Sequence, residues 1–190
     1  MAIRKRIWIY PDANPSITNS TTISNTSNTV SNSTTLDYFT VNFSIAGTAG
    51  GNGYLYANLP LSSYTIQAGD YLEYCIYLPN ITGQQAFGVD IFFTNGVLRD
   101  AGQYDQNGMA AHPATDLTAQ AGQKWYYRKI PITTGTGGST IGTSITNIQP
   151  TCENETIGTS VARFKNIAIT DGKGTGVYET KNFINFTGSN

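Results

Sequence analysis

Apolar and polar residues alternate along most of the chain, and this pattern predicts β-strands. The segment DYFTVNFSIA places apolar side chains on every second position, at Phe39, Val41, Phe43 and Ile45. A period of two indicates a strand with one buried face. Comparable runs, separated by turns rich in Gly or Asn, are YLYANL, DYLEYCIYLP, FGVDIFFT, KWYYRKIPI, SVARFKNIAIT and VYETKNFINF.

No segment carries a sustained apolar period of 3.6 residues, so we expect little helix. Roughly seven or eight short strands punctuated by turns are typical of a β-sandwich. The sequence therefore predicts an all-β fold. Its domain is a jelly-roll β-sandwich over residues 36–190, preceded by an extended N-terminal arm over residues 1–35.

The predicted arm has two parts. Residues 3–10 indicate a strand of period two, with Ile3, Lys5, Ile7 and Ile9 on one face and Arg4, Arg6, Trp8 and Tyr10 on the other. The apolar members of this strand are Ile3, Ile7, Trp8, Ile9 and Tyr10. Residues 16–35 contain six Ser, seven Thr and four Asn and no charge. Such a tail buries too little apolar surface to offset its own ordering entropy, so it needs a partner to become ordered.

Two arrangements could supply that partner. In one, the tail folds back and residues 3–10 add an edge strand to their own domain. In the other, the arm completes the sheet of a neighbouring copy, since residues 11–35 can span up to ~80 Å at about 3.3 Å per residue. Strand addition satisfies the backbone groups of both partners.

A head-to-tail contact of the second kind does not close on itself, so its repetition produces a filament. This arrangement predicts a non-enzymatic structural subunit of an extracellular glycosylated fibre, whose partners are other copies of the chain. The predicted assembly strand comprises Ile3, Ile7, Trp8, Ile9 and Tyr10. The mechanism resembles that of donor-strand pili, although no pilin motif is present.

Net charge and composition limit which partners and which location we expect for the protein. A net charge of −1 argues against a nucleic-acid partner, which needs a basic surplus. No stretch approaches the ~20 apolar residues of a membrane span, so we expect no membrane insertion. Low charge with abundant Ser, Thr, Asn and Gly is typical of extracellular or cell-surface proteins.

Glycosylation and a disulfide would suit that setting. The hydroxyl-rich tail offers a track for O-linked sugars. The two cysteines, Cys75 and Cys152, could form one bridge or remain two separately buried thiols, and their spacing does not decide between these. The candidate sites for covalent N-glycans are the Asn-x-Ser/Thr sequons at Asn19, Asn25, Asn32, Asn42, Asn80, Asn154 and Asn185.

Three runs of the chain carry a resemblance to a known family: GVDIFFTNGVLRDAGQYDQNGMAAHPATD, KWYYRKIPI and VARFKNIAITDG. Together they resemble the jelly-roll accessory modules of secreted bacterial glycoside hydrolases. Those modules carry Asp-x-x-Phe-Thr-Asp-Gly at a strand end, then Asp-Gln-x-Gly and His-Pro, then an aromatic strand. The resemblance covers about residues 66–172. Asn95 replaces the usual Asp, and the arm has no counterpart. The resemblance implies a sandwich related to carbohydrate-binding modules, with catalysis located elsewhere.

Modules of this kind often hold a structural calcium ion, which prefers carboxylate and carbonyl oxygens. The spacing here is not that of an EF-hand, and Asp and Asn are also common turn formers. Two interpretations therefore stay open: a structural calcium ion as cofactor, or ordinary turns formed by Asp and Asn. The residues that would hold it are Asp90, Asp100, Asp105, Asn107 and Asp171.

Carbohydrate binding, as an adhesin or accessory module, is the alternative function. Flat aromatic faces contact sugar rings, while amides hold hydroxyl groups. Consecutive aromatic residues in the run KWYYRKIPI must place at least one ring outward if they form a strand. Core packing is nevertheless the commoner explanation for any single ring. The candidate contacts are Tyr104, Gln106, Trp125 and Tyr126.

Enzymatic activity is the least expected function. His112 is the only histidine, and it precedes a proline that favours a turn. Asp90 with Asp100 or Asp105 could serve as a glycosidase pair. However, 12 acidic residues make some suggestive pair inevitable. We therefore expect no catalytic residues.

Overall fold

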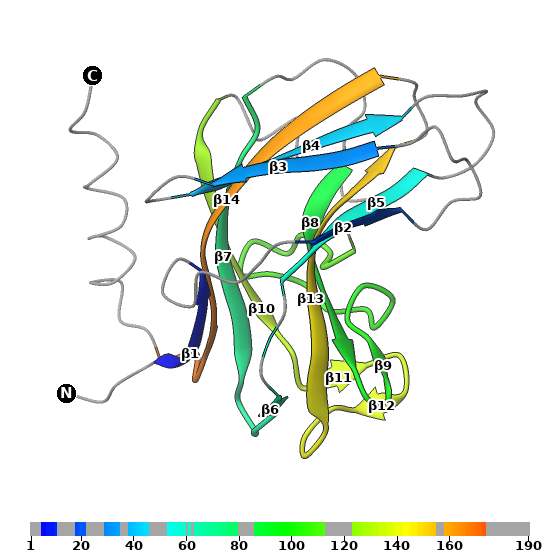
Figure 1. Cartoon of the computed structure of the whole chain (residues 1–190). Coiled ribbons are helices and arrows are strands. Elements are labelled where there is room, and N and C mark those ends of the chain that lie inside the picture. The colour runs from blue at the N-terminus through cyan, green and yellow to red at the C-terminus, as the bar shows by residue number, and fades with distance from the viewer. Residues whose placement is uncertain are drawn as a thin grey trace.

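The protein, described here from a computed structural model, is built from strands and connecting segments (Figure 1). Two six-stranded antiparallel sheets pack face to face. No helix occurs among the described residues, so the predicted all-β sandwich is confirmed. The structure describes residues 5–10, 18–21, 29–34, 38–45, 53–59, 61, 63–79, 86–112, 123–154 and 158–173.

One sheet, called the β14 sheet after its longest strand, has the order β10-β7-β14-β4-β3, and β1 pairs separately with β14. Its strands are β1 (Lys5–Tyr10), β3 (Thr29–Thr34), β4 (Phe39–Ile45), β7 (Tyr71–Tyr77), β10 (Trp125–Pro131) and β14 (Gly158–Thr170).

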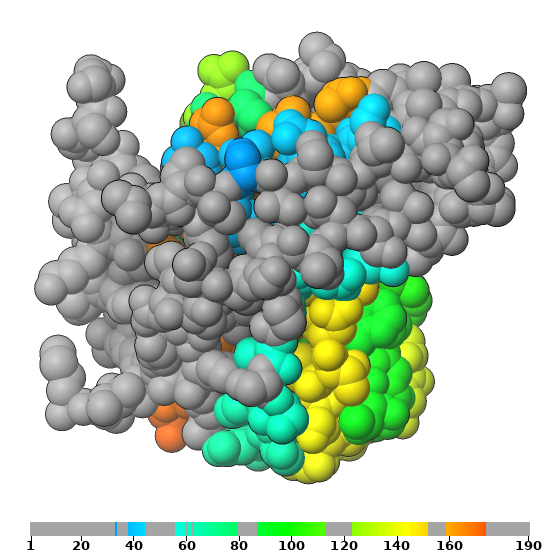
Figure 2. Space-filling view, in the orientation of Figure 1, coloured from blue at the N-terminus to red at the C-terminus, as the bar shows by residue number. Residues whose placement is uncertain are grey.

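The other, the β13 sheet, has the order β2-β5-β13-β8-β9, with β6 paired separately to β13. Figure 2 shows residues of β13, in yellow, beside those of β8, in green, on the visible face. A small hairpin, β11 (Thr134–Gly135) with β12 (Gly138–Ser139), completes the described strands. The strands of the β13 sheet are β2 (Thr18–Thr21), β5 (Gly53–Asn58), β6 (Tyr64–Thr65), β8 (Ala86–Phe93), β9 (Gly96–Val97) and β13 (Ser144–Asn154).

The strand order is that of a jelly roll. From β4 onward the chain passes repeatedly between the sheets. Strands β4, β7, β10 and β14 belong to the β14 sheet, while β5, β8, β9 and β13 belong to the β13 sheet. The first strands of the domain, β4 and β5, lie beside its last strands, β14 and β13. This interleaving of both chain ends defines the jelly roll.

The core lies between the sheets and follows the period of two. On β4, Phe39, Val41 and Phe43 are fully buried, whereas the intervening residues are half-buried. Phe43 meets Phe87 of the opposite sheet with ring centroids 5.9 Å apart. Burying each such side chain contributes about 1.5–3 kcal/mol, so this face fixes the register of β4.

The arm pairs with its own chain in this structure. Strand β1 pairs with β14, β2 pairs with β5, and β3 pairs with β4. This is the first of the two predicted arrangements, in which the tail folds back. The Ser/Thr/Asn-rich segment, in which the apolar pattern predicts no strand, contributes β2 and β3, because backbone hydrogen bonds to open sheet edges need no apolar side chains.

Sequence reasoning missed β13, which is central in its sheet. The strand is polar and contains Pro150, which lacks the N–H that an inner strand donates to its ladder. The ladder to β5 covers Thr151–Asn154 and resumes only at the bridge between Leu59 and Ile148, so Pro150 lies at the interruption. The predicted strand VYETKNFINF lies outside the described residues.

Candidate functional site

A loop after β9 folds against β10 and is fixed by a buried ion pair. Arg128 of β10 is 1% exposed, and its Nε donates to Asp105 Oδ2 at 2.8 Å. Its Nη1 donates to Tyr74 Oη at 3.3 Å, and its Nη2 donates to the carbonyls of Met109 and Ala110. Every arm of the guanidinium therefore has a partner, which a buried charge requires.

The pKa values at this ion pair follow from burial and charge. Desolvation raises the pKa of Tyr74. Desolvation also acts to lower the pKa of Arg128, but Tyr74 and Asp105 outweigh it and the net shift is upward. Arg128 thus stays charged, and its role is to fix the loop.

The same loop caps the free edge of β10. The Gln106 side chain donates from Nε2 to the Tyr127 carbonyl at 2.8 Å and accepts from the Lys129 amide at 2.7 Å. Its amide thereby takes the place of a neighbouring strand. A capped edge resists pairing with other chains, because its backbone groups already have partners. On this edge of the β14 sheet, those groups are the Tyr127 carbonyl and the Lys129 amide.

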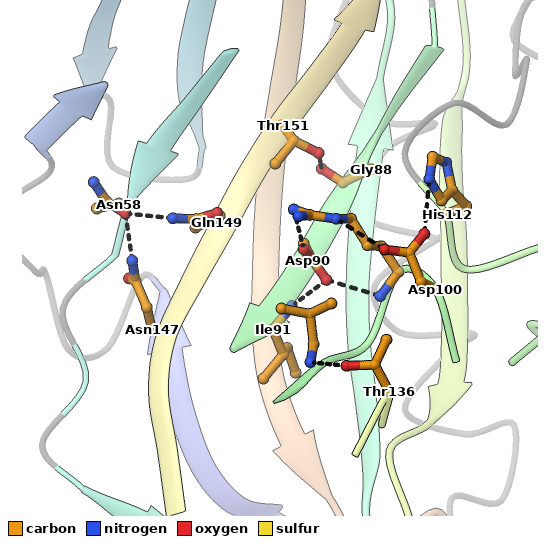
Figure 3. Close-up of polar contacts among 12 residues, drawn as sticks. Asn58, Gly88, Asp90, Ile91, Asp100, His112, Thr136, Asn147, Gln149 and Thr151 are labelled. Atoms are coloured by element: carbon orange, nitrogen blue, oxygen red, sulfur yellow. Dashed lines mark hydrogen bonds and ion pairs between the residues drawn. The ribbon is translucent and has the colours of Figure 1, made fainter. Parts of the chain in front are cut away.

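A second series of polar contacts links β8 to the loop after β9 (Figure 3). Asp90 is fully buried and accepts hydrogen bonds from the Ile91 and Arg99 amides and from the Arg99 guanidinium. Arg99 also pairs with Asp100 at 3.4 Å, and Asp100 lies 3.3 Å from His112. The predicted carboxylate pair, Asp90 with Asp100, is therefore bridged by an arginine.

The five predicted calcium ligands do not gather into one site in the described part of the chain. Asp90 faces Arg99, and Asp105 faces Arg128 and accepts from the Asn107 amide. Asp171 accepts from the Lys173 amide at 3.1 Å and so forms a local turn. Within the described ranges, no three His, Cys, Asp or Glu side chains form a group suited to a metal ion.

The four predicted sugar contacts come from the loop and from both faces of β10. Tyr104 is 56% exposed on the loop, and the Gln106 amide is engaged with β10. Trp125 and Tyr126 are consecutive on β10 and lie on opposite faces, with Tyr126 packed against the core. Burial raises the pKa of Tyr126. Trp125 and Tyr126 therefore do not face the same side of the sheet, and sugar binding by the predicted residues stays a prediction.

Trp125 instead belongs to a different cluster on the outer face of the β14 sheet, here called the Arg163 patch. The centroid of the Trp125 ring lies 5.9 Å from that of Tyr38 and 5.5 Å from that of Tyr77. The Arg163 guanidinium lies 5.3 Å from the centroids of both tyrosine rings. Lys165 lies 4.0 Å from the Trp125 ring. The patch consists of Tyr38, Tyr77, Trp125, Arg163 and Lys165.

Sequence reasoning missed this patch because its residues come from four strand regions. The available signals were Tyr38, which stands outside the apolar row of β4, and the alternation of Arg163 and Lys165 with Ala162 and Phe164. Only the register of β7 with β10 and β14 places these side chains in one row.

The predicted assembly strand lies along one part of β14. Residues Gly158–Phe164 of β14 pair with β4, whereas Ile167–Thr170 pair with β1 on the side that β4 leaves (Figure 1). Asn166, with a φ of 52°, marks the bulge between the two parts. Ile7 pairs with Ile169 and Trp8 with Ala168. Ile3 lies outside the described residues.

The sequons are spread over both sheets. Asn42 is half-buried on the outer face of β4, as the alternation predicts. Asn19, Asn32 and Asn154 lie on β2, β3 and β13, and nothing is described of their side chains. Asn25, Asn80 and Asn185 lie outside the described residues, so glycosylation stays a prediction.

Cys75 is a free, buried thiol, so the bridge to Cys152 is not formed in this structure. On β7, the neighbours Tyr74 and Ile76 point into the core. Cys75 therefore faces away from the sheet that contains Cys152. Burial raises the pKa of the Cys75 thiol to about 12. Nothing is described of the Cys152 side chain.

Comparison with known proteins adds no relative. No family model matches the chain, and no curated protein resembles it closely enough to count as a match. Among the described residues there is no helix of the length and apolar character that a membrane crossing needs. The proposals below therefore depend on geometry and sequence.

Proposed function

We propose that this protein is a non-enzymatic structural subunit of an extracellular glycosylated fibre, in which β1 moves from its own β14 to the β14 of the next copy. The observation that carries the proposal is the pairing of β1 with Ile167–Thr170. That segment is a sheet edge that β4 does not reach, and the strand that fills it comes from the opposite end of the sequence.

Exchange of this strand is inexpensive because the same backbone hydrogen bonds form with either copy. With β2 and β3 still in place, residues 11–17 alone link β1 to the domain and span up to about 23 Å. Pro11 and Pro15 stiffen this link. A tether of this kind gives an effective concentration of roughly millimolar, so exchange requires high local subunit concentration.

The remaining features agree with a structural role. The aspartates that could have formed a catalytic pair instead hold Arg99 and Arg128. Sequons on β2 and β3 would place glycans along the same arm. These observations support a structural extracellular protein. Carbohydrate binding by Tyr104, Gln106, Trp125 and Tyr126 is the alternative, and the opposite facing of Trp125 and Tyr126 weighs against it.

Light scattering after size-exclusion chromatography tests the proposal with a proline placed in β1. Ile7→Pro places a proline in the short strand β1 and should weaken its pairing, while Ile7→Val at the same position keeps a strand-forming side chain. We expect mass to rise with concentration for the wild type and Ile7→Val, and a monomer for Ile7→Pro. Equal masses for all three proteins, or a larger mass for Ile7→Pro, would overturn strand donation.

A further inference from the structure

Three Asn-Gly pairs occur in the sequence, at Asn52, Asn95 and Asn107. Asn52 lies outside the described residues, whereas Asn95 and Asn107 lie in turns that the structure describes. In this dipeptide the backbone nitrogen of glycine can attack the asparagine side chain, because glycine has no side chain to obstruct the ring that forms. Asparagine is accordingly one of the residues that limit the chemical durability of proteins.

The Asn95–Gly96 pair is held in place by its surroundings. The Asn95 side chain donates from Nδ2 to the Ser139 carbonyl at 2.9 Å, and its Oδ1 is buried. The Asn95 carbonyl lies so close to Gly137 that a Cβ on Gly137 has no room. Gly96 is paired with Phe93 in the ladder between β8 and β9. The side chain of Asn95 and the amide of Gly96 therefore cannot turn towards each other without breaking these contacts.

The Asn107–Gly108 pair, by contrast, lies at the exposed tip of the loop after β9. Both residues are exposed, and no hydrogen bond to the Asn107 side chain occurs among the described residues. Gly108 has a φ of 77°, and a Cβ built on it would meet no atom beyond its chain neighbours within 4 Å. The Gly108 amide donates to the Asp105 carbonyl at 3.0 Å. Ring closure needs only this exposed peptide unit to rotate, and exposed loop segments open at low free-energy cost.

We propose that Asn107 is a site of spontaneous deamidation and isoaspartate formation, whereas Asn95 keeps its amide. The Gly108 nitrogen gives its proton to hydroxide and bonds to the Asn107 Cγ. The Cγ–Nδ2 bond then breaks, and the side-chain nitrogen takes up a proton from water and leaves as ammonia. A second water opens the resulting succinimide ring at either carbonyl, which gives aspartate or isoaspartate. The reaction does not depend on fibre assembly, since the pair and its surroundings belong to one chain.

The isoaspartate product weakens the Gln106 cap on β10. Asp105 Oδ1 accepts from the Asn107 and Met109 amides, both at 2.9 Å, and these amides lie on either side of the modified bond. Isoaspartate carries the backbone through the former side chain and adds a carbon atom between the two amides. Asp105 then cannot hold both amides in the same turn, and Gln106 lies between Asp105 and Asn107 in the chain. Ageing of the protein therefore loosens the side chain that closes the β10 edge.

Peptide mass spectrometry of the full chain, kept at mildly alkaline pH, measures deamidation at both sites. The tryptic peptide 100–124 contains Asn107 as its only asparagine, and the chymotryptic peptide 94–98 contains only Asn95. Synthetic peptides of the same sequences give the rates without the fold. We expect Asn107 in the protein to react within about tenfold of its peptide rate, and Asn95 to react at least about 100-fold slower than its peptide. Equal protection of the two sites, or an Asn107 that keeps its amide, would overturn the proposal.

Hydrogen–deuterium exchange of the Lys129 amide tests the effect on the cap. Asn107→Asp is the matched control, because it carries the same added charge on an ordinary backbone. After chromatographic separation of the aged protein, we expect this amide to exchange at least about tenfold faster in the isoaspartate form than in the unmodified protein, and within about threefold of it in Asn107→Asp. Equal exchange in the isoaspartate form and in Asn107→Asp would overturn the loosening of the cap.

Discussion

The two long edges of the β14 sheet are closed in different ways. The β10 edge is covered by Gln106 on a loop that Arg128 and Asp105 fix from the core. The opposite side is covered by β1 and β3, strands of the arm at the start of the chain. The first closure cannot leave without breaking a buried ion pair, whereas the second is held to the sheet by strand pairing. In the proposed assembly, the arm-covered side is therefore the one that exchanges between copies.

The largest expected effect on stability comes from breaking the Arg128–Asp105 ion pair, which fixes the loop against β10. Arg128→Met leaves the Asp105 carboxylate buried without its partner and should lower the free energy of unfolding by about 3–5 kcal/mol in urea titrations. Arg163→Met, at a half-buried site without an ion pair, should cost less than about 1 kcal/mol. A cost for Arg128→Met similar to that of Arg163→Met would show that the loop is not fixed in this way.

The exchange rates of backbone amides compare the closures without mutation. The amides of β1 should exchange with solvent at least about 100-fold faster than the Lys129 amide, because the arm can open locally while the Gln106 cap cannot. Hydrogen–deuterium exchange resolved by NMR measures both. Equal protection of β1 and Lys129 would remove the distinction between the two edges.

The loss of stability at alkaline pH tests whether the Cys75 thiol is buried on the outer face of the β14 sheet. The pKa of Cys75 in the folded state is about 12, above its ordinary value of 9.0. Its contribution to stability is therefore full below pH 9 and is lost as pH rises towards 12, since only the unfolded chain ionises in that window. The wild type should lose about 1.4 kcal/mol more than Cys75→Ala between pH 7 and 10.

Urea titrations at each pH measure this difference. Tyr74, whose pKa is also raised by burial, contributes equally to both proteins. Parallel curves for the wild type and Cys75→Ala would show that the thiol is not buried on this face.

The smallest expected effect on stability comes from removing the Gln106 side chain, which caps the edge of β10. Gln106→Ala removes two hydrogen bonds to β10 and should cost about 0.5–1.5 kcal/mol, with faster exchange of the Lys129 amide. Gln103→Ala is the matched control, since Gln103 donates only to the Ala101 carbonyl within the loop. Equal effects of the two variants on Lys129 exchange would contradict the capping role.

Much of this fold could be predicted because burial imposes a period of two. The row from Phe39 to Phe43 and the runs that became β7, β8, β10 and β14 all show it. Strands β2 and β3 could not be found in this way, since backbone pairing at sheet edges leaves no apolar pattern. Strand β13 was hidden by Pro150, whose missing donor fits an interruption in the ladder.

The sites were harder to predict than the strands because they depend on pairing between strands. The acidic loop suggested calcium, but Asp90 and Asp105 face arginines that come later in the chain. The aromatic run suggested one binding surface, but alternation divides Trp125 from Tyr126. Residue types alone could not show which partner each side chain meets.

Disulfide trapping of β1 against β14 tests the central proposal most directly. Trp8 and Ala168 are register partners, so Trp8→Cys with Ala168→Cys can be oxidised in a background where Cys75 and Cys152 are alanine. Ser44→Cys with Thr159→Cys, which joins β4 to β14, is the control and should cross-link only within one chain. At high subunit concentration, strand donation predicts a ladder of covalent multimers for the β1 pair on a non-reducing gel. Efficient cross-linking that yields only single chains at every concentration would contradict it.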